Sequence, residues 1–209
     1  MNKIIISIFL VLTFFCSPVM SETAIDWYEK ANALTAGNKK NTDLQKAIEF
    51  LNNAIRLRPD WADAYYNRGT LYNDLGQHQR AIEDFNRAIS LEPNMADAYN
   101  NRGYAYNDLS QYQHAIEDFN KAISLKPDII DAYNNRGIAY FNLDKYQNAI
   151  EDFNKAIILK PDLADAYGNR GYAYLMQGKK RLGCSDVQKA CVLGKCSALE
   201  MVKDKGYCR

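Results

Sequence analysis

Four cysteines close to the C-terminal end are the side chains with the greatest capacity for chemistry in this sequence. Their spacing is Cys-x6-Cys-x4-Cys-x11-Cys, and they are Cys184, Cys191, Cys196 and Cys208. Thiolates bind zinc, and paired thiols form disulfides in oxidising compartments. The spacing lacks the short Cys-x2-Cys pairs that zinc sites commonly use. We therefore favour two disulfides over a zinc site, and we expect no bound metal.

The remaining reactive side chains form no catalytic arrangement. His78 and His114 do not share a spacing that would make them a metal-binding pair. Glu83 and Asp84 are adjacent in a pattern that belongs to a helix surface. No glycine-rich phosphate loop and no nucleophilic serine turn occurs in the sequence. We expect neither an enzyme nor a cofactor.

The charges of the chain are almost balanced, with 26 lysines and arginines against 25 aspartates and glutamates. Such a balance produces no strong field that would attract nucleic acid or an anionic membrane, so neither partner is expected. The body of the chain is mildly acidic, and residues 179–209 are mainly basic. Solvated helix faces explain this difference, and a docking surface on the basic tail is the alternative.

The N-terminal residues have the pattern of a signal peptide. A positive start at residues 1–3 precedes an apolar run at residues 4–15, which is too short to span a bilayer comfortably. Pro18 then breaks any helix. We expect residues 1–21 to be removed by cleavage after Ser21, which gives an exported protein, periplasmic or secreted, without a membrane anchor. An uncleaved anchor is the alternative.

An internal repeat defines the elements that must position the functional residues. Prolines recur with a step of 34 residues at Pro59, Pro93, Pro127 and Pro161. The block Ala-Tyr-x-Asn-Arg-Gly begins at residues 64, 98, 132 and 166, and Ala-Ile-Glu-Asp-Phe-Asn begins at residues 81, 115 and 149. A fixed period of this length indicates stacked copies of one small structural unit.

Each unit is predicted to contain two helices. Apolar and small residues in the first helix fall on one face at i, i+4 and i+7, and the second helix repeats this pattern. In the unit that starts at residue 62 they are Tyr65, Gly69 and Tyr72, followed by Ala81, Phe85 and Ala88. The small residues allow the paired helices to approach closely. Pro93 should end the second helix, and Asn94 is expected to cap the next one.

The positions of these residues resemble the signature of tetratricopeptide (TPR) repeats, with tyrosine in place of the usual first tryptophan. The resemblance covers complete units at residues 62–95, 96–129 and 130–163, a divergent first unit at 22–61 and a divergent last unit at 164–195. The first unit carries extra residues near Gly37, and the last has Gly183 and Val187 where alanine and phenylalanine are usual. The predicted fold is all-α, a solenoid of helical hairpins that ends in a capping segment at residues 196–209.

The resemblance implies a right-handed superhelix whose first helices line a concave groove. Such grooves typically hold a peptide or a helix of a partner protein, so the chain is expected to be a scaffold for protein interactions. Two alternatives remain open at this point. The array could associate with itself or with the cell envelope as a structural element, or it could serve as an accessory subunit of an envelope enzyme.

A row of asparagines recurs at a position that faces the groove in TPR proteins. Its members are Asn67, Asn101, Asn135 and Asn169. Asparagine forms helices poorly, and its amide can both donate and accept hydrogen bonds to a peptide backbone. The row therefore predicts contacts with the backbone of a bound segment. Recent duplication of one unit, which copies any residue, is the alternative explanation.

Groove positions next to this row differ between units and are rich in aromatic residues. They include Tyr66, Tyr104, Ile138, Phe141 and Tyr172. Variable aromatics beside a fixed polar row are consistent with selective recognition, because tyrosine is enriched at interface hot spots. Packing between units is the alternative role for each of them.

A row of arginines is predicted to be structural. In a helical hairpin, Arg68, Arg102 and Arg136 come opposite Asp84, Asp118 and Asp152 of the second helix. Arginine–carboxylate bridges at these places would lock each hairpin. Arg170 has Asp186 at the equivalent position, so a fourth bridge is possible.

The pairing of the four cysteines follows from the expected helices. Cys184 and Cys191 lie seven residues apart on one predicted helix, about 10.5 Å along its axis, which exceeds the span of a disulfide. A turn after Cys191 and a final helix near residues 197–205 bring Cys191 beside Cys196 and place Cys184 near Cys208. We therefore predict the disulfides Cys184–Cys208 and Cys191–Cys196, which would hold a capping helix over the end of the solenoid.

Overall fold

The computed structural model describes residues 22–36 and 40–208, and within them the chain contains eleven helices and no strand. The all-helical prediction is therefore confirmed for this part of the chain. The predicted signal peptide at residues 1–21, and most of the extra residues of the first unit, lie outside it. The helices are α1 Ala24–Thr35, α2 Asn41–Leu57, α3 Ala62–Asp74, α4 His78–Leu91, α5 Ala96–Asp108, α6 Tyr112–Leu125, α7 Ile130–Asn142, α8 Tyr146–Leu159, α9 Ala164–Met176, α10 Lys180–Val192 and α11 Ser197–Asp204.

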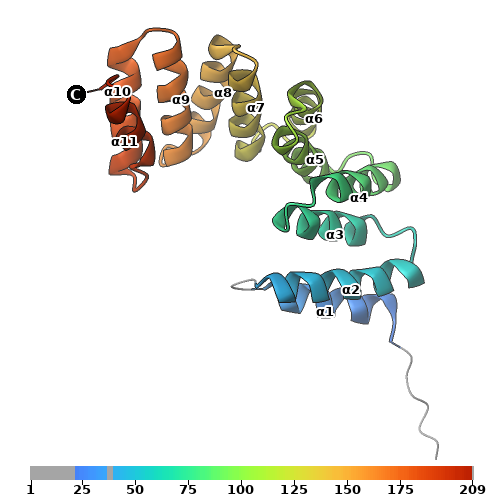
Figure 1. Cartoon of the computed structure of the whole chain (residues 1–209). Coiled ribbons are helices and arrows are strands. Elements are labelled where there is room, and N and C mark those ends of the chain that lie inside the picture. The colour runs from blue at the N-terminus through green and yellow to red at the C-terminus, as the bar shows by residue number, and fades with distance from the viewer. Residues whose placement is uncertain (1–21, 37–39, 209) are drawn as a thin grey trace, which may run out of the picture.

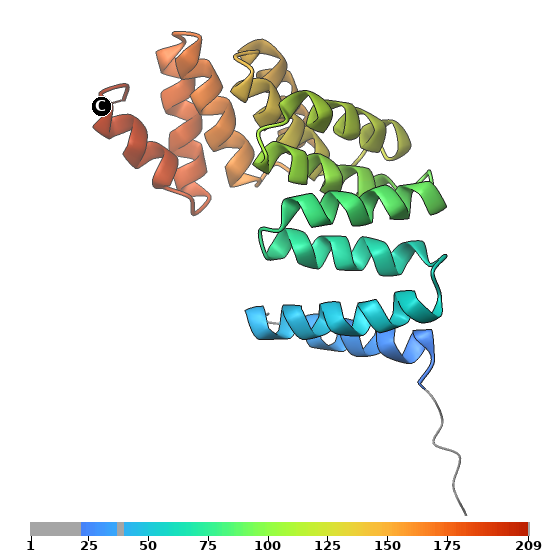
Figure 2. The ribbon, with the colours of Figure 1, turned by 45° about the vertical axis from the view of Figure 1, so that its right-hand side comes forward.

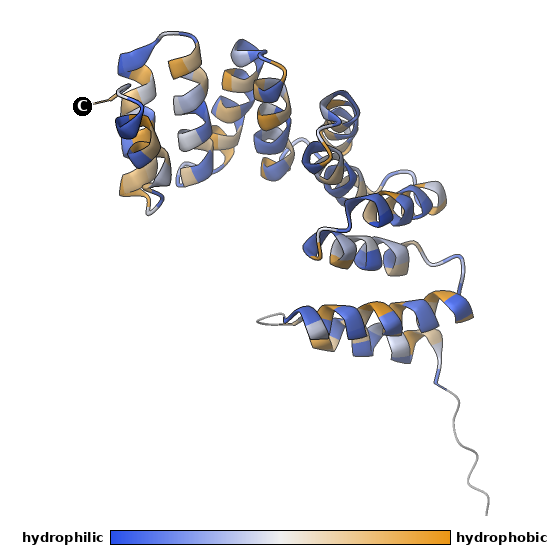
Figure 3. Cartoon of the chain, in the orientation of Figure 1, coloured by the Kyte–Doolittle hydropathy of each residue, from blue (hydrophilic) through white to orange (hydrophobic). Residues whose placement is uncertain are grey.

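Consecutive helices pair into hairpins, and the hairpins follow one another along a curved path (Figure 1 and Figure 2). Every helix carries both apolar and polar residues (Figure 3), so one hairpin alone cannot bury its apolar face. Stacking buries it, because each hairpin contacts the next through its neighbouring helices. The hairpin α1–α2 lies at one end of the array, and α10 and α11 lie at the other.

The close approach of paired helices depends on a glycine of the first helix and a phenylalanine of the second. In the unit at 96–129 the Phe119 ring is fully buried against Gly103 of α5. A Cβ atom added at Gly103 would lie 2.8 Å from Phe119 Cε1, which is closer than van der Waals contact allows. Only glycine therefore fits this position while the ring stays in place. Gly69 and Gly137 meet Phe85 and Phe153 in the same way.

The divergent last unit keeps this close approach with different side chains. A Cβ atom at Gly171 would lie 2.8 Å from Val187 Cγ1, so valine takes the place of the phenylalanine. Leu175, which is buried, reaches across the hairpin to Gly183, where an added Cβ atom would lie 2.5 Å from Leu175 Cγ. The glycine at position 183, where alanine is usual, therefore leaves room for Leu175.

First helices also contact one another along the array. In the described part of the chain, α3 contacts α5, α5 contacts α7 and α7 contacts α9, whereas successive second helices have no contact of comparable extent. Neighbouring first helices are therefore closer together than neighbouring second helices. This arrangement places the first helices on the inner side of the curve and the second helices on the outer side.

The starts of the first helices differ from the expectation in one respect. Asn94 does not cap α5, because the helix begins at Ala96 and its N-cap residue is Met95, which makes no side-chain capping bond. The turn after α4 includes Pro93 and Asn94, so the helix starts one residue later than predicted. Asp97 in the first turn still provides the negative charge that favours the helix dipole.

The C-terminal segment forms the expected capping helix. α11 begins at Ser197 and ends at Asp204, and Val202 on its inner face is fully buried against the last hairpin. Lys195, which precedes α11, forms an ion pair with Asp165 of α9 at 2.7 Å. None of the helices in the described residues combines the length and apolarity that a membrane span requires.

Candidate functional site

The arginine row forms the predicted bridges in all four places. Arg102 Nε donates to Asp118 Oδ2 at 2.7 Å, and Arg102 Nη2 donates to Asp118 Oδ1 at 2.6 Å. The same two-pronged geometry joins Arg68 to Asp84, Arg136 to Asp152 and Arg170 to Asp186. The fourth bridge, which the sequence left open, is therefore present. These guanidinium groups are engaged within the fold, as the structural interpretation predicts.

Each arginine also makes a third contact that the sequence did not reveal. Arg102 Nη1 donates to Asn86 Oδ1 at 2.5 Å, and Asn86 belongs to α4 of the preceding unit. Arg68, Arg136 and Arg170 reach Asn52, Asn120 and Asn154 in the same manner. One arginine thus connects its own hairpin to the previous one. The fixed asparagine that ends the block Ala-Ile-Glu-Asp-Phe-Asn was the available signal.

Burial and pairing shift the pKa values of the bridged side chains in opposite directions. Burial raises the pKa of Asp118, although the hydrogen bonds and charge of Arg102 act in the opposite direction. Burial lowers the pKa of Arg102, but the hydrogen bonds to Asp118, the negative charge of Asp118 and nearby tyrosines together outweigh this effect and leave the pKa above its ordinary value. The pairs at Asp84 and Asp152 behave alike. Removal of the arginine would leave a buried carboxylate without its partner and would strongly destabilise the fold.

The asparagine row lies between neighbouring first helices. Asn67 Nδ2 donates to Tyr28 Oη at 2.8 Å, and Asn101 Nδ2 donates to Tyr66 Oη at 3.2 Å. Asn169 Nδ2 donates to Asn134 Oδ1 at 3.3 Å. In these three asparagines the amide nitrogen is thus directed to the preceding unit. Asn135 is half-buried at the equivalent position of α7.

Two asparagines outside this row complete the contacts between first helices. Asn73 Nδ2 donates to the carbonyl oxygen of Asn101 at 3.1 Å, and Asn107 Nδ2 donates to that of Asn135 at 3.0 Å. Their role was missed because each side chain bonds to a backbone group of the next unit, which repeat positions do not identify. The predicted groove residue Tyr104 of α5 remains 43% exposed.

Four of the residues predicted to form the groove line one cavity near the C-terminal end. The cavity has a volume of about 320 Å³ and lies against α7, α9 and the residues after α11. The predicted residues in its lining are Ile138, Phe141, Asn169 and Tyr172. Phe153, Met176, Lys205 and Tyr207 also line it and were not predicted. Lys205 and Tyr207 could not be found from the repeat, because they follow its last unit.

The other predicted groove residues are distributed along the first helices. Tyr66 and Asn67 line a cavity of about 290 Å³ against α1. Tyr66 and Asn101 also line a polar cavity of about 450 Å³ beside the turn between α6 and α7. The structure therefore brings the predicted residues together in separate places along the inner side, and of these three cavities the C-terminal one has the most apolar lining.

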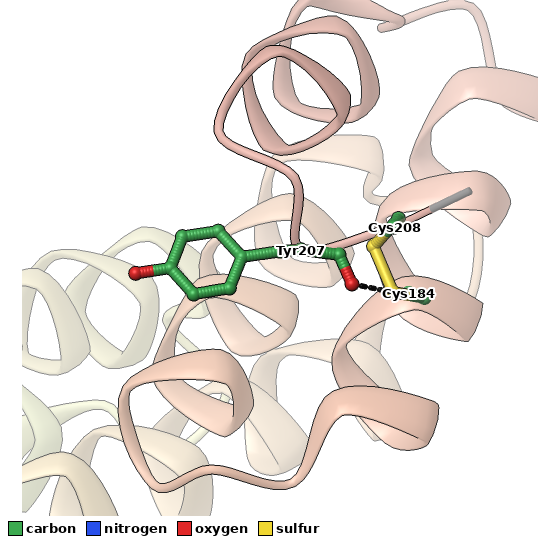
Figure 4. Close-up of a disulfide and its surroundings, with 3 residues drawn as sticks. All are labelled: Cys184, Tyr207 and Cys208. Carbon is green, nitrogen blue, oxygen red and sulfur yellow. Dashed lines mark hydrogen bonds between the residues drawn. A yellow bond between two sulfur atoms is a disulfide. The ribbon is translucent and has the colours of Figure 1, made fainter.

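The tail that borders the C-terminal cavity is attached to α10 by a disulfide. The structure contains Cys184–Cys208 and Cys191–Cys196, which are the pairs expected from the sequence. Cys184 Sγ lies 3.5 Å from the carbonyl oxygen of Tyr207 (Figure 4). This is a van der Waals contact and not a hydrogen bond, because a disulfide sulfur carries no proton. The four thiols are thus used in disulfides, and the described residues contain no other group of side chains suited to a metal ion.

Comparisons with known proteins agree with this geometry. The sequence model described as tetratricopeptide repeat matches residues 62–95, 96–129 and 130–163, and a further one described as TPR repeat matches residues 42–76. This chain belongs to the tetratricopeptide repeat family. No curated protein sequence gives a significant match to the TPR array.

Solved structures similar to the TPR array include a crystal structure of MamA protein, with a TM-score of 0.73 and 26% identity, covering 89% of this chain and 96% of that one. MamA 41-end from Desulfovibrio magneticus RS-1 gives 0.75 and 21%, covering 83% and 96%. YrrB, described as a TPR protein with an unusual peptide-binding site, gives 0.70 and 24%, covering 86% and 92%. The family and these folds identify the chain as a scaffold for protein interactions in general terms.

Proposed function

We propose that the TPR array is an exported scaffold that binds an extended segment of a partner protein along its first helices. The observation that carries this proposal is the position of the predicted groove residues. They lie on the inner helices, and Ile138, Phe141, Asn169 and Tyr172 share one cavity. Cavities with apolar walls and a few polar groups are the usual sites of ligand binding.

The asparagine row supplies the polar part of the proposed site. Because Asn67, Asn101 and Asn169 direct their amide nitrogens to the preceding unit, these side chains are held in fixed orientations. An amide oxygen has two lone pairs and can accept a further hydrogen bond. We expect these oxygens to accept from backbone N–H groups of the partner, which binds a segment without dependence on its sequence.

The variable residues supply selectivity in this proposal. Tyr104 is 43% exposed on α5, and Ile138 and Phe141 face the cavity on α7. Apolar and aromatic side chains of this kind provide most of the binding energy in many interfaces. The peptide-binding site ascribed to YrrB supports the same use of a TPR fold.

Photo-crosslinking in the native cell tests the proposal. A photoreactive residue in place of Tyr104 should capture one dominant partner, which mass spectrometry identifies. The same residue at Glu117, an exposed position of α6 on the outer side, is the matched control and should not capture it. Asn101→Ala together with Asn135→Ala should reduce capture from Tyr104 while the helical circular dichroism stays unchanged. Capture of the chain alone, or equal capture from both positions, would favour the structural array instead.

A further inference from the structure

The C-terminal cavity differs from the rest of the inner side in the origin of its walls. Ile138, Phe141 and Met176 come from the first helices, whereas Tyr207 comes from the segment after the capping helix. The chain therefore adds a wall to the groove with residues that no repeat encodes. Met176 remains 39% exposed at this place, although it is a large apolar side chain.

The size and lining of the cavity fit a single large side chain. A volume of about 320 Å³ lies at the lower end of the range for small-molecule sites and is too small for a helix. Most of its lining is apolar or aromatic. An aromatic or long aliphatic side chain would remove this surface from water and gain the corresponding hydrophobic energy.

The charge around the cavity indicates which residues would flank that side chain in the partner. Lys205 lines the cavity, is exposed, and forms no ion pair among the residues that the structure describes. Residues 179–209 carry eight basic and three acidic side chains, and of the acidic ones Asp186 is bridged to Arg170. The C-terminal end therefore presents unpaired positive charge beside an apolar cavity, which complements negative charge in a partner.

We propose that this cavity is the anchor site for one bulky apolar side chain in an acidic segment of the partner, and that the Cys184–Cys208 disulfide holds the wall that forms it. Tyr207 is the residue adjacent to Cys208, and Cys184 lies in α10, so the bond fixes Tyr207 relative to the last hairpin (Figure 4). Cys184 and Cys208 act as positioning residues, whereas Tyr207 contacts the bound side chain. The proposal rests on the proposed use of the groove and assigns its specificity.

Methyl NMR of the mature protein with ¹³C-labelled methionines tests the site directly. The probe is a short peptide of glutamates with one central phenylalanine, and its comparisons carry alanine at the centre or lysines in place of the glutamates. The Met176 methyl signal should shift with the first peptide only, whereas Met95, in the turn before α5, should not move. Equal shifts at both methionines, or equal affinity for the lysine peptide, would overturn the assignment.

Variants distinguish the contribution of Tyr207 to peptide binding from that of the other C-terminal residues. The affinity for the probe peptide should fall about tenfold in Tyr207→Ala, and also in the double variant Cys184→Ser with Cys208→Ser. Tyr207→Phe should bind like the parent, because it keeps the ring. Cys191→Ser with Cys196→Ser is the matched control, since it removes the other disulfide and leaves the lining residues in place. Unchanged affinity in Tyr207→Ala, which retains both disulfides, would refute the role of the wall.

The outcome is distinguishable from a failure of the groove proposal. If crosslinking from Tyr104 captures a partner and Tyr207→Ala leaves that capture unchanged, the groove binds but the anchor site is wrong. If neither Tyr104 nor a crosslinker at Met176 captures a partner, the groove proposal itself fails.

Discussion

Replacing Arg102 with methionine tests whether the arginine row is structural. The substitution keeps an unbranched side chain of similar reach and removes the guanidinium group. It deletes two hydrogen bonds to Asp118, at 2.7 and 2.6 Å, and one to Asn86 at 2.5 Å. Asp118 is then left as a carboxylate whose side chain is only 8% exposed.

The expected cost follows from this burial. Removing one partner of a buried ion pair destabilises a protein by about 3–5 kcal/mol. We expect a value near the lower end, about 3 kcal/mol, because the Arg102 side chain is 17% exposed and water can partly replace it. Arg87→Met is the matched control. Arg87 is exposed on α4, so its loss should change the free energy of unfolding by about 0.5 kcal/mol or less.

The cost should also depend on pH in a defined direction. Burial raises the pKa of Asp118, and without Arg102 the opposing hydrogen bonds and charge are gone, so this pKa rises further. The folded variant then binds a proton more readily than the unfolded chain. The penalty is present at neutral pH and is relieved as the pH falls through the raised pKa. Arg102→Met should therefore cost less at pH 5 than at pH 7.

Urea unfolding followed by circular dichroism measures these differences, with the slope compared between variants because repeat arrays can unfold in parts. The double variant Arg102→Met with Asp118→Leu should recover much of the loss, since two apolar groups replace the pair. A cost below about 1 kcal/mol for Arg102→Met, or a cost that grows as the pH falls, would refute the structural interpretation. The arginine row would then be available for ligand binding.

Three further predictions concern the backbone and the cap. Gly103→Ala should destabilise the chain by about 1–2 kcal/mol, because a clash with Phe119 exceeds the gain in helix propensity, and thermal unfolding measures the net effect. Ser110→Gly should stabilise it by about 0.5–1 kcal/mol in the same assay, because Ser110 has a φ of 59° that glycine adopts without strain. Peptide mapping under non-reducing conditions should recover Cys184 joined to Cys208, and serine at both positions should cost about 3 kcal/mol.

The repeat made most of the fold predictable from the sequence. Tyr65, Gly69 and Phe85 identify a helical hairpin because their spacing, size and order must agree for the helices to approach. The bridge from Arg68 to Asp84 was predictable for the same reason, since both residues recur with the period. Residues that recur and lie opposite each other in a known unit can be paired without coordinates.

Contacts between units were harder to predict, because they depend on how the hairpins stack. The bond from Arg102 to Asn86 and that from Asn107 to the Asn135 carbonyl cross a unit boundary, and the repeat alone does not give their geometry. The expected cap at Asn94 was wrong since the turn takes up that residue before α5 begins. Tyr207 lies beyond the last repeat, and its place beside Met176 depends on the path of the chain after α11.

The three-way contact of each arginine also determines where the array is weakest. Leu34 stands one repeat length before Arg68, so the first helix has no arginine to tie it to its neighbours. The opposite end is closed by two covalent bonds. Fraying under heat or mechanical load should therefore begin at α1 and advance toward the C-terminus. The C-terminal cavity, which lies at the opposite end from α1, would be the last part of the groove to unfold.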